Sequence, residues 1–436
     1  MTTTTGDTSA RTHGTRLADS DARPAHPGSR PASPGTRLAS LDGLRGVAAL
    51  IVVVYHLSLV ARPFLDNRTT GDAWWWLTQT PLKLFTAGTE SVLVFFVLSG
   101  VVVSLPALRA GFGWSGYYGG RMLRLYLPVW ASLALAAVLI ALLPRDVSAI
   151  TQGAWIDRAN AHTLSLRQLL EEASLWRATY DVNNVLWSLR WELVFSLALP
   201  LFVWAASRLR AHWHLAAALA IVVTVSGRLL HVDALVYLPV FFLGSLIAVR
   251  LPELLAWRPP RSFWTIATIA SLGLLIASWL VRPIEGAISS EVLWGLSGVG
   301  AAGLVVVAIA SPWARRMLST AVPRWLGKVS FSLYLVQAPI IATLAFALGD
   351  ERWKLIAALG VPLSLGAAWL FHRFVERPSH VLAKRVSARL NRKRSSYEST
   401  STESTLPAGS RNHAMSGPRS GPEERAMPRS SVNSPS

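Results

Sequence analysis

The chain has 436 residues, of which 52% are hydrophobic and 15% charged, and its formal net charge is +18. Soluble domains carry roughly 25% charged residues, so this composition excludes most soluble folds and favours a membrane protein. A nucleic-acid-binding protein would gather its basic residues on one wetted face among stacking aromatics, whereas here they are scattered between apolar runs. The chain has no cysteine, which excludes disulfides, thiolate metal ligands and a cysteinyl-enzyme intermediate.

Both ends of the chain are rich in Thr, Ser, Pro, Gly and Arg and poor in large apolar side chains. We predict that residues 1–37 and 388–436 are disordered tails, because neither can bury enough apolar surface to offset the entropy of ordering. The first apolar run begins near Val47 and has no small-residue cleavage site after it, so we expect no cleavable signal peptide. Residues 38–380 form the predicted membrane domain.

The region between the tails predicts an all-α, polytopic membrane fold with about ten transmembrane helices. A helix needs about 20 residues to cross the hydrocarbon core, and ten segments reach or approach that length. These segments are 44–62, 84–106, 123–143, 185–206, 213–230, 235–251, 262–281, 292–311, 327–348 and 353–375. Because their number is even, both termini are expected on the same side.

The distribution of charge predicts which side that is. Segments on the side of the termini carry 30 Lys and Arg against 10 Asp and Glu, whereas the opposite loops carry 11 and 12. The positive-inside rule therefore places both termini in the cytoplasm and the protein in the plasma membrane. The one sizeable outer loop, residues 144–184, contains Trp155 and Trp176 and is either a lid or only an interfacial belt.

Ionisable residues at membrane depth are the first candidates for chemistry, because burying each costs at least about 2.5 kcal/mol. Glu90, Arg190 and Glu192 lie at that depth. Arg190 and Glu192 are two residues apart and point in different directions, so each needs a partner from another helix. Glu90 is one candidate partner, and its alternative interpretation is a carboxylate still in headgroup water.

Arg45 and His56 lie on one face of the first predicted helix. Their separation of eleven residues corresponds to three turns plus about 20° and an axial distance of roughly 16 Å. Arg45 would then lie at the inner interface and His56 near mid-membrane, where an imidazole can titrate near neutral pH. The alternative is that Arg45 binds lipid phosphate and His56 is only an interhelical hydrogen-bonding residue.

Two further stretches have both a functional and a structural interpretation. Arg121 and Arg124 are three residues apart on a helix, so they share a face and can chelate a phosphate, although they can equally be positive-inside anchors. The run from Phe95 to Gly100 includes Ser99 and puts small residues where two helices can approach closely, which more often serves packing than chemistry.

Several motifs, taken in order, resemble the membrane-bound acyltransferase family 3. Residues 41–49, LDGLRGVAA, followed by His56, resemble its opening signature. The other matching pieces are FFVLSG at 95–100, the RxxR at 121–124 followed by Pro128, WSLxxE at 187–192, the SLYL core within 327–335, and FVERP at 374–378. Together they cover about residues 40–380, and their order on a ten-helix topology makes the resemblance specific.

The resemblance implies an O-acyltransferase. Its donor would be cytoplasmic acyl-CoA, with acetyl or another short acyl group. Its acceptor would be a hydroxyl of a glycan, a glycolipid or a glycosylated small molecule. It implies no metal and no nucleic-acid partner, only the two substrates and membrane lipid.

The resemblance also implies roles for individual residues. Arg45, Arg121 and Arg124 would hold the phosphates of CoA. His56 would be the general base that takes the proton of the acceptor hydroxyl. Glu192 would orient either the imidazole or the acceptor. Candidates for substrate contact or structural support are Asp42, Glu90, Ser99 and Trp187.

Three positions depart from the family pattern. Gln337 stands where many members have a histidine, Val101 replaces an aromatic residue, and Arg190 lies inside the WSLxxE run. Gln337 cannot act as a base, so any role of a second histidine is lost. A transporter or exporter, using Arg, His and Glu as substrate or proton relays, is the first alternative function, and a non-catalytic envelope assembly protein is the second.

Overall fold

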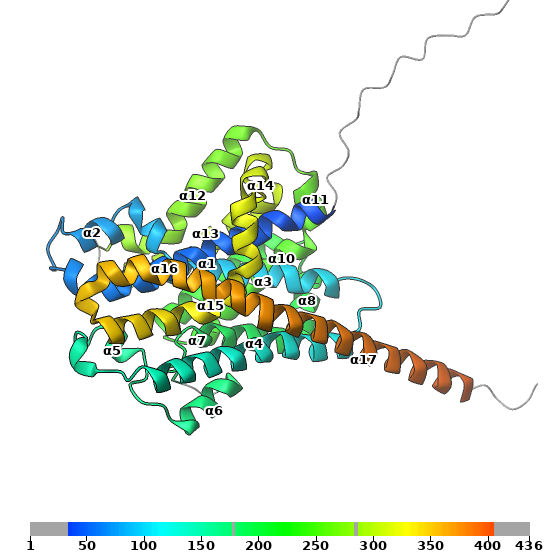
Figure 1. Ribbon diagram of the computed structural model, residues 1–436. Helices are drawn as coiled ribbons and strands as arrows, with labels where there is room; N and C mark the ends of the chain where they lie inside the picture. Colours follow the sequence, from blue (N-terminus) through cyan, green and yellow to red (C-terminus); the bar gives the residue numbers. More distant parts are fainter. Residues whose placement is uncertain (1–33, 177–178, 283–286, 405–436) are drawn as a thin grey trace, which may run out of the picture.

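The computed structural model describes residues 34–176, 179–282 and 287–404, and within these ranges it is helical without a strand. The all-α membrane fold predicted from the sequence is confirmed (Figure 1). The helices are α1 (Pro34–Leu65), α2 (Ala73–Thr78), η1 (Pro81–Thr86), α3 (Gly88–Ala107), α4 (Trp114–Leu142), η2 (Val147–Ala149), α5 (Trp155–Arg158), α6 (Leu166–Ser174), α7 (Leu186–Leu197), α8 (Leu199–Arg208), α9 (Trp213–Leu229), α10 (Asp233–Val249), α11 (Leu251–Ala256), α12 (Arg261–Leu280), α13 (Ala287–Ala310), α14 (Pro312–Leu318), α15 (Ala321–Leu348), η3 (Asp350–Arg352), α16 (Trp353–Phe371), η4 (His372–Glu376) and α17 (Arg377–Ser404).

All ten predicted segments are helical, and most are long enough to cross a membrane. In the described ranges seven helices meet the length and composition needed for a span, and the pair α7 and α8 makes an eighth. This pair bends by 65°, because Pro200 near the start of α8 has no N–H with which to continue α7. The two remaining helices, α9 and α10, have 17 residues each and are about 26 Å long, which is the lower limit for a span.

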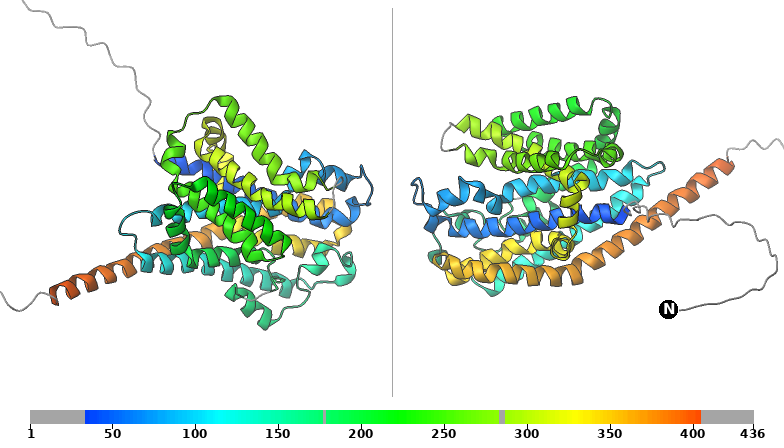
Figure 2. Two further views of the ribbon diagram at one scale, coloured as in Figure 1. Left: turned by 180° about the vertical axis from the view of Figure 1, so that it is seen from behind. Right: turned by 90° about the horizontal axis from the view of Figure 1, so that it is seen from above.

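The described helices extend into both predicted tails. Helix α1 begins at Pro34, and α17 runs to Ser404, so the described helices overlap the ends of both ranges for which we predicted disorder. For the second range, the reason is that α17 continues α16 through a π-helical turn and packs along α4, where Asn391 accepts a 3.0 Å hydrogen bond from the backbone N–H of Gly116. The rest of both tails lies outside the described residues. The start of α1 and the end of α17 leave the bundle at the same end (Figure 2).

Two apolar cores build the membrane domain. One core gathers side chains of α3, α10 and α13, and the other gathers side chains of α4, α15 and α16. Helices α1 and α7 contribute to both cores. The seam between the cores is where polar side chains collect, as described below.

Glycines bring the central helices into backbone contact. A Cβ atom on Gly327 of α15 would lie 2.1 Å from the carbonyl oxygen of Asp42 on α1, and one on Gly46 would lie 2.3 Å from the backbone nitrogen of Gly327. Likewise, a Cβ atom on Gly100 of α3 would lie 2.8 Å from the Cα of Gly244 on α10. The small residues at 95–100 therefore serve close packing at Gly100, as the sequence favoured.

The described part of the outer loop, residues 144–176 and 179–184, folds onto one end of the bundle. The carboxylate of Glu172 accepts hydrogen bonds from the backbone N–H groups of Val182 and Asn183, at 2.7 and 3.0 Å. The side chain of Asn183 donates to the carbonyl of Leu335 on α15, at 3.0 Å. Trp176 is 58% exposed, as expected for an interfacial belt. Trp155, in contrast, covers the buried His56, as expected for a lid. Both interpretations of this loop, the lid and the interfacial belt, therefore have support.

Gly244→Ala should destabilise the protein, because the new methyl group would lie 2.2 Å from the carbonyl oxygen of Val97 and would push α3 away from α10. Gly273→Ala on α12 is the matched control, since a Cβ atom there meets no atom within 4 Å. Helix propensity alone favours alanine over glycine by about 1 kcal/mol. Thermal unfolding in detergent should therefore show a lower midpoint for Gly244→Ala only. Equal midpoints for the two variants would contradict the close contact.

Glu172 should make the outer loop sensitive to pH. Burial raises the pKa of Glu172 from its ordinary 4.5 to about 7. The protonated form is therefore favoured in the folded loop, and its stabilising contribution, complete below about pH 4.5, is lost as the pH rises through about 7. Backbone amides of residues 144–176 should be better protected from hydrogen exchange at about pH 5.5 than at about pH 8.5, after correction for intrinsic rates.

Glu172→Gln should remove this pH dependence, because glutamine does not titrate. Glu171→Gln is the control, since the neighbouring Glu171 is paired with Arg167 on the exposed face of α6. A pH dependence that survives in Glu172→Gln would assign the effect to another group.

Candidate active site

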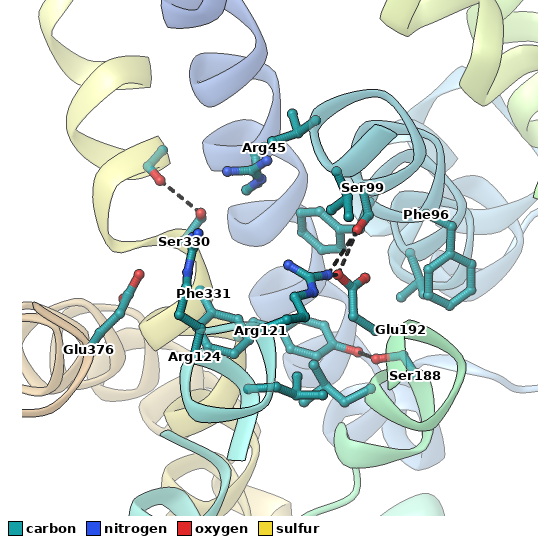
Figure 3. Close-up of a pocket in the computed structure, with 18 of the residues that line it drawn as sticks. Arg45, Phe96, Ser99, Arg121, Arg124, Ser188, Glu192, Ser330, Phe331 and Glu376 are labelled. Atoms are coloured by element: carbon teal, nitrogen blue, oxygen red, sulfur yellow. Dashed lines mark hydrogen bonds and ion pairs between the residues drawn. The ribbon is translucent and has the colours of Figure 1, made fainter. Parts of the chain in front are cut away.

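A pocket of about 210 Å³ lies at the seam between the two apolar cores (Figure 3). We call the part lined by Arg124, which is exposed, and Arg45, which is part-exposed, its mouth. Its deep end is the part lined by the buried residues Ser188 and Tyr334. Its polar lining consists of Arg45, Ser99, Arg121, Arg124, Ser188, Glu192, Ser330, Tyr334, Glu376 and His380. The structure therefore brings together the three arginines that the family resemblance assigned to CoA, and Glu192 and Ser99 with them.

Arg121 is held inside the protein by an ion pair. Its guanidinium group contacts the carboxylate of Glu192, and its Nε donates to Ser196 Oγ at 2.9 Å. Ser99 Oγ donates to the same carboxylate at 2.6 Å. The side chains of Arg121 and Glu192 are 16% and 18% exposed. Pairing offsets much of the cost of placing either charge at this depth, so Arg121 is the partner of Glu192 that the sequence required and did not identify.

Arg124 and Arg45 keep more of their positive charge available to a ligand. Within the described ranges, no carboxylate lies within salt-bridge distance of Arg124. Arg45 Nη1 lies 3.4 Å from Oδ1 of Asp42, whose side chain is 53% exposed. An ion pair this exposed is weak. The mouth of the pocket is therefore a cationic site built from α1 and α4.

A π-helical turn forms one wall of the mouth. It spans His372–Glu376 and turns Glu376 toward the pocket (Figure 3). Glu376 accepts a 2.5 Å hydrogen bond from Ser332, and Nδ1 of His372 lies 3.0 Å from the same carboxylate oxygen. Such turns are frequent at functional sites. We did not select Glu376 or His380 from the sequence, although the FVERP motif that contains Glu376 was the available signal.

His56 is buried beyond the deep end of the pocket. Its Nδ1 lies 3.1 Å from Oε1 of Gln337, and its ring stacks on that of Trp155 with centroids 5.1 Å apart. Gln337 follows Tyr334, which lines the pocket, by three residues of α15, an axial distance of about 4.5 Å. Gln337, which we noted only as a departure from the family, is therefore the hydrogen-bonding partner of His56.

The contact with Gln337 sets the chemistry available to His56. When Nδ1–H donates to the amide oxygen of Gln337, Nε2 of the imidazole carries the free lone pair. The amide nitrogen of Gln337 has no hydrogen-bonding partner among the described residues. No second hydrogen bond of the amide group therefore opposes the contact of its oxygen with His56. Trp155 covers the imidazole from the outer loop. His56 is therefore an oriented, water-protected histidine.

Glu90 does not pair with Arg190 or Glu192. It is fully buried, accepts a 2.7 Å hydrogen bond from Nε1 of Trp279 and lies 3.7 Å from Nζ of Lys83. The interpretation of Glu90 as a residue in headgroup water is therefore wrong. Lys83 is buried with it, and we missed this pair because Lys83 precedes the predicted span and was assigned to a loop.

Two other candidate residues lie away from the pocket. The ring of Trp187 packs against that of Tyr237 with centroids 5.4 Å apart, and Arg190 lies over the ring of Trp191 at 5.3 Å. Trp187 is thus a packing residue between the two cores. In the part of the chain that the structure describes, no cluster of three His, Asp or Glu side chains is arranged to hold a metal ion.

Comparison with known proteins identifies the fold as that of an enzyme family. A family model described as an acyltransferase domain, that of acyltransferase family 3, matches residues 38–373. The O-acetyltransferase PaAT-1 of Phomopsis amygdali is 25% identical over 382 residues, which cover 72% of this chain and 74% of that protein. No solved structure matches the chain significantly.

The family match covers most of the membrane domain and includes Arg45, His56, Arg121, Arg124 and Glu192. Together with the O-acetyltransferase relative, it supports the enzyme class predicted from the motifs, an O-acyltransferase, over a transporter or a non-catalytic protein. The chain belongs to acyltransferase family 3.

Proposed function

We propose that this enzyme transfers an acetyl or other short acyl group from cytoplasmic acyl-CoA to a hydroxyl of a glycan, a glycolipid or a glycosylated small molecule. The observation that carries the proposal is the arrangement of the pocket. Its cationic mouth is lined by Arg45 and Arg124, and its buried end is lined by Tyr334, one helical turn from Gln337, which contacts His56. One end of the pocket is thus positively charged and the other lies next to the proposed base. This arrangement suits a donor that carries phosphates at one end and a thioester at the other.

The size of the pocket favours binding of the acyl end of the donor inside the protein. Sites for drug-sized ligands usually measure about 300–1,000 Å³, so a pocket of about 210 Å³ suits the acyl group and part of the pantetheine arm. The nucleotide phosphates would remain at the mouth, where Arg124 and Arg45 can donate charge-assisted hydrogen bonds. This division assigns Arg124 a binding role and leaves Arg121 to hold Glu192.

His56 is proposed as the general base. Its Nε2 takes the proton of the acceptor hydroxyl as the acceptor oxygen bonds to the thioester carbon. The carbon–sulfur bond then breaks, and the imidazolium returns the proton to the leaving thiolate, so the enzyme ends unchanged. Direct transfer fits a chain without cysteine. Gln337 acts as a positioning residue that holds the required tautomer of His56.

We propose that Glu192 has a structural role in the pocket and does not orient the imidazole of His56. Its carboxylate is occupied by Arg121 and Ser99, while the hydrogen-bonding partner of His56 is Gln337. Glu192 would therefore shape the middle of the pocket by fixing Arg121. Of the two roles considered from the sequence, orientation of the imidazole is not supported by this geometry.

The acceptor is proposed to enter from the outer side, at the end of the bundle covered by the outer loop. Trp155 stacks on His56 there, so an acceptor that reaches the imidazole from this side would contact the large apolar surface of an indole ring. The similarity to the O-acetyltransferase of Phomopsis amygdali supports oxygen as the acceptor atom and acetyl as the simplest acyl group. The plasma membrane, with both termini in the cytoplasm, remains the proposed location.

His56→Ala should abolish acyl transfer while the protein remains in the membrane. Loss of a general base lowers the rate by about 10²–10⁴-fold. The measurement is turnover of radiolabelled acetyl-CoA by membranes that contain equal amounts of the two proteins. His214→Ala, which changes an exposed histidine at the start of α9, should retain activity. Undiminished product with His56→Ala would reject the base assignment.

Arg124→Ala should raise the KM for acyl-CoA with a smaller effect on kcat. Hydrogen bonds to charged groups contribute about 1.5–3 kcal/mol, which corresponds to roughly a tenfold to hundredfold change. Arg208→Ala removes an exposed cation at the same end of the bundle, outside the pocket, and serves as the control. A donor titration that is unchanged by Arg124→Ala would return this residue to the role of a topology anchor.

Arg124 is a cleaner test than Arg121. Removing Arg121 would leave the carboxylate of Glu192 buried without its partner, and an unpaired buried charge is strongly destabilising. Loss of activity in an Arg121 variant would therefore report on folding as much as on donor binding.

A further inference from the structure

Two buried hydroxyl groups face each other at the deep end of the pocket. Ser188 on α7 and Tyr334 on α15 both line it, and their oxygen atoms lie 2.7 Å apart. Figure 3 shows the hydroxyl of Ser188 directed at the neighbouring tyrosine oxygen. The two residues are only 5% and 6% exposed. Neither residue has a role in the mechanism described so far.

The hydrogen bonds of this pair leave one O–H group free to change partner. Ser188 Oγ lies 3.1 Å and Tyr334 Oη 3.2 Å from the same acceptor, the backbone carbonyl of Val185. The two hydroxyl groups therefore have two hydrogens to donate. One can form the bond to the shared carbonyl of Val185, and the other can form the bond between the two hydroxyls. If one hydroxyl donates to Val185, the other can donate to a ligand at the expense of only the bond between the hydroxyls.

The position of the pair suits the reacting carbonyl. Along α15, Gly327 and Ser330 line the pocket nearer its mouth, Tyr334 lines its deep end, and Gln337 lies one turn further on, bonded to His56. The ring of Phe95 packs edge-on against Tyr334 at 5.7 Å and limits its movement. A donor anchored by phosphates at the mouth would present its thioester near the hydroxyls and next to the general base.

We propose that Ser188 and Tyr334 are catalytic residues that form an oxyanion hole for the thioester carbonyl. This inference rests on the proposed function. As the acceptor oxygen bonds to the carbonyl carbon, the electron pair of the C=O π bond moves onto oxygen. The free O–H group of the pair then donates to that oxyanion. Collapse of the tetrahedral intermediate restores the C=O bond and expels the thiolate, which receives the proton from His56.

A preorganised donor is most effective in a site that excludes water. In such a site the hydrogen bond from the preorganised hydroxyl becomes stronger as negative charge develops on the carbonyl oxygen, and no solvent has to reorganise. The purely structural alternative is that the two hydroxyls only link α7 to α15. The chain offers a control for that alternative, because Ser104 on α3 and Ser245 on α10 form a buried hydroxyl pair, 2.9 Å apart, that does not line the pocket.

Kinetics of Tyr334→Phe, Ser188→Ala and the double variant test the proposal. Removal of one oxyanion donor typically lowers kcat by about 10²–10³-fold, and we expect kcat to fall while the KM for acetyl-CoA changes little. In either single variant the remaining hydroxyl donates to Val185. The double variant should therefore lose little more than each single variant, which a double-mutant cycle reports as strong coupling.

Ser104→Ala should leave kcat within about twofold of the wild-type value, although it breaks a similar link between helices, because substitutions away from the reacting atoms act mainly on stability. If Ser104→Ala lowers kcat as much as Ser188→Ala does, the effect is one of packing and the proposal is wrong. Unchanged kcat in Tyr334→Phe and Ser188→Ala would equally overturn it.

Infrared spectroscopy separates this inference from the proposed function. Isotope-edited difference spectra with [1-¹³C]acetyl-CoA, recorded on the full-length protein without acceptor, should show a thioester carbonyl band at lower frequency when the donor is bound than when it is free. Tyr334→Phe should return the band toward the frequency of the free donor. A bound band that is the same in both proteins would overturn the oxyanion hole alone. Absence of any bound donor band would overturn the proposed donor, and the inference with it.

Discussion

The close contact of α1 with α15 positions most of the site. Because Gly46 and Gly327 have no side chain, the two backbones touch near the end of the bundle at which α1 begins. From that contact, α1 carries Arg45 at the mouth and His56 three turns further on, while α15 carries Tyr334 at the deep end of the pocket and Gln337 beside His56. Larger residues at the crossing would separate the helices and break the hydrogen bond between His56 and Gln337.

The cost of burying charge divides the ionisable residues into two groups. Arg121 with Glu192, and Lys83 with Glu90, are pairs in which each charge offsets the burial of the other. Such pairs hold helices and loops in place. Arg124, which has no carboxylate partner in the described part of the chain, keeps its charge for a ligand at the mouth. Of these pairs, Arg121 and Glu192 line the pocket, and the unpaired Arg124 is the residue that we propose to bind the anionic part of the donor.

The seam between two apolar cores explains why the polar residues of the site can exist inside a membrane protein. Each core excludes water on one side of the pocket, so the hydroxyls of Ser188 and Tyr334 and the imidazole of His56 have protein partners rather than solvent. Trp155 completes this exclusion by stacking on His56. A dry site strengthens electrostatic stabilisation of a transition state and protects a thioester from hydrolysis.

The sequence by itself determined the membrane fold, the helix positions and the family, because apolar runs and short motifs are local in the chain. It also selected Arg45, Arg121 and Arg124, which share one pocket. Only the tertiary structure decided the partners: Glu192 with Arg121, Glu90 with Lys83, and His56 with Gln337. Contacts between residues as far as 281 positions apart depend on how helices cross, and no pattern within one helix specifies that.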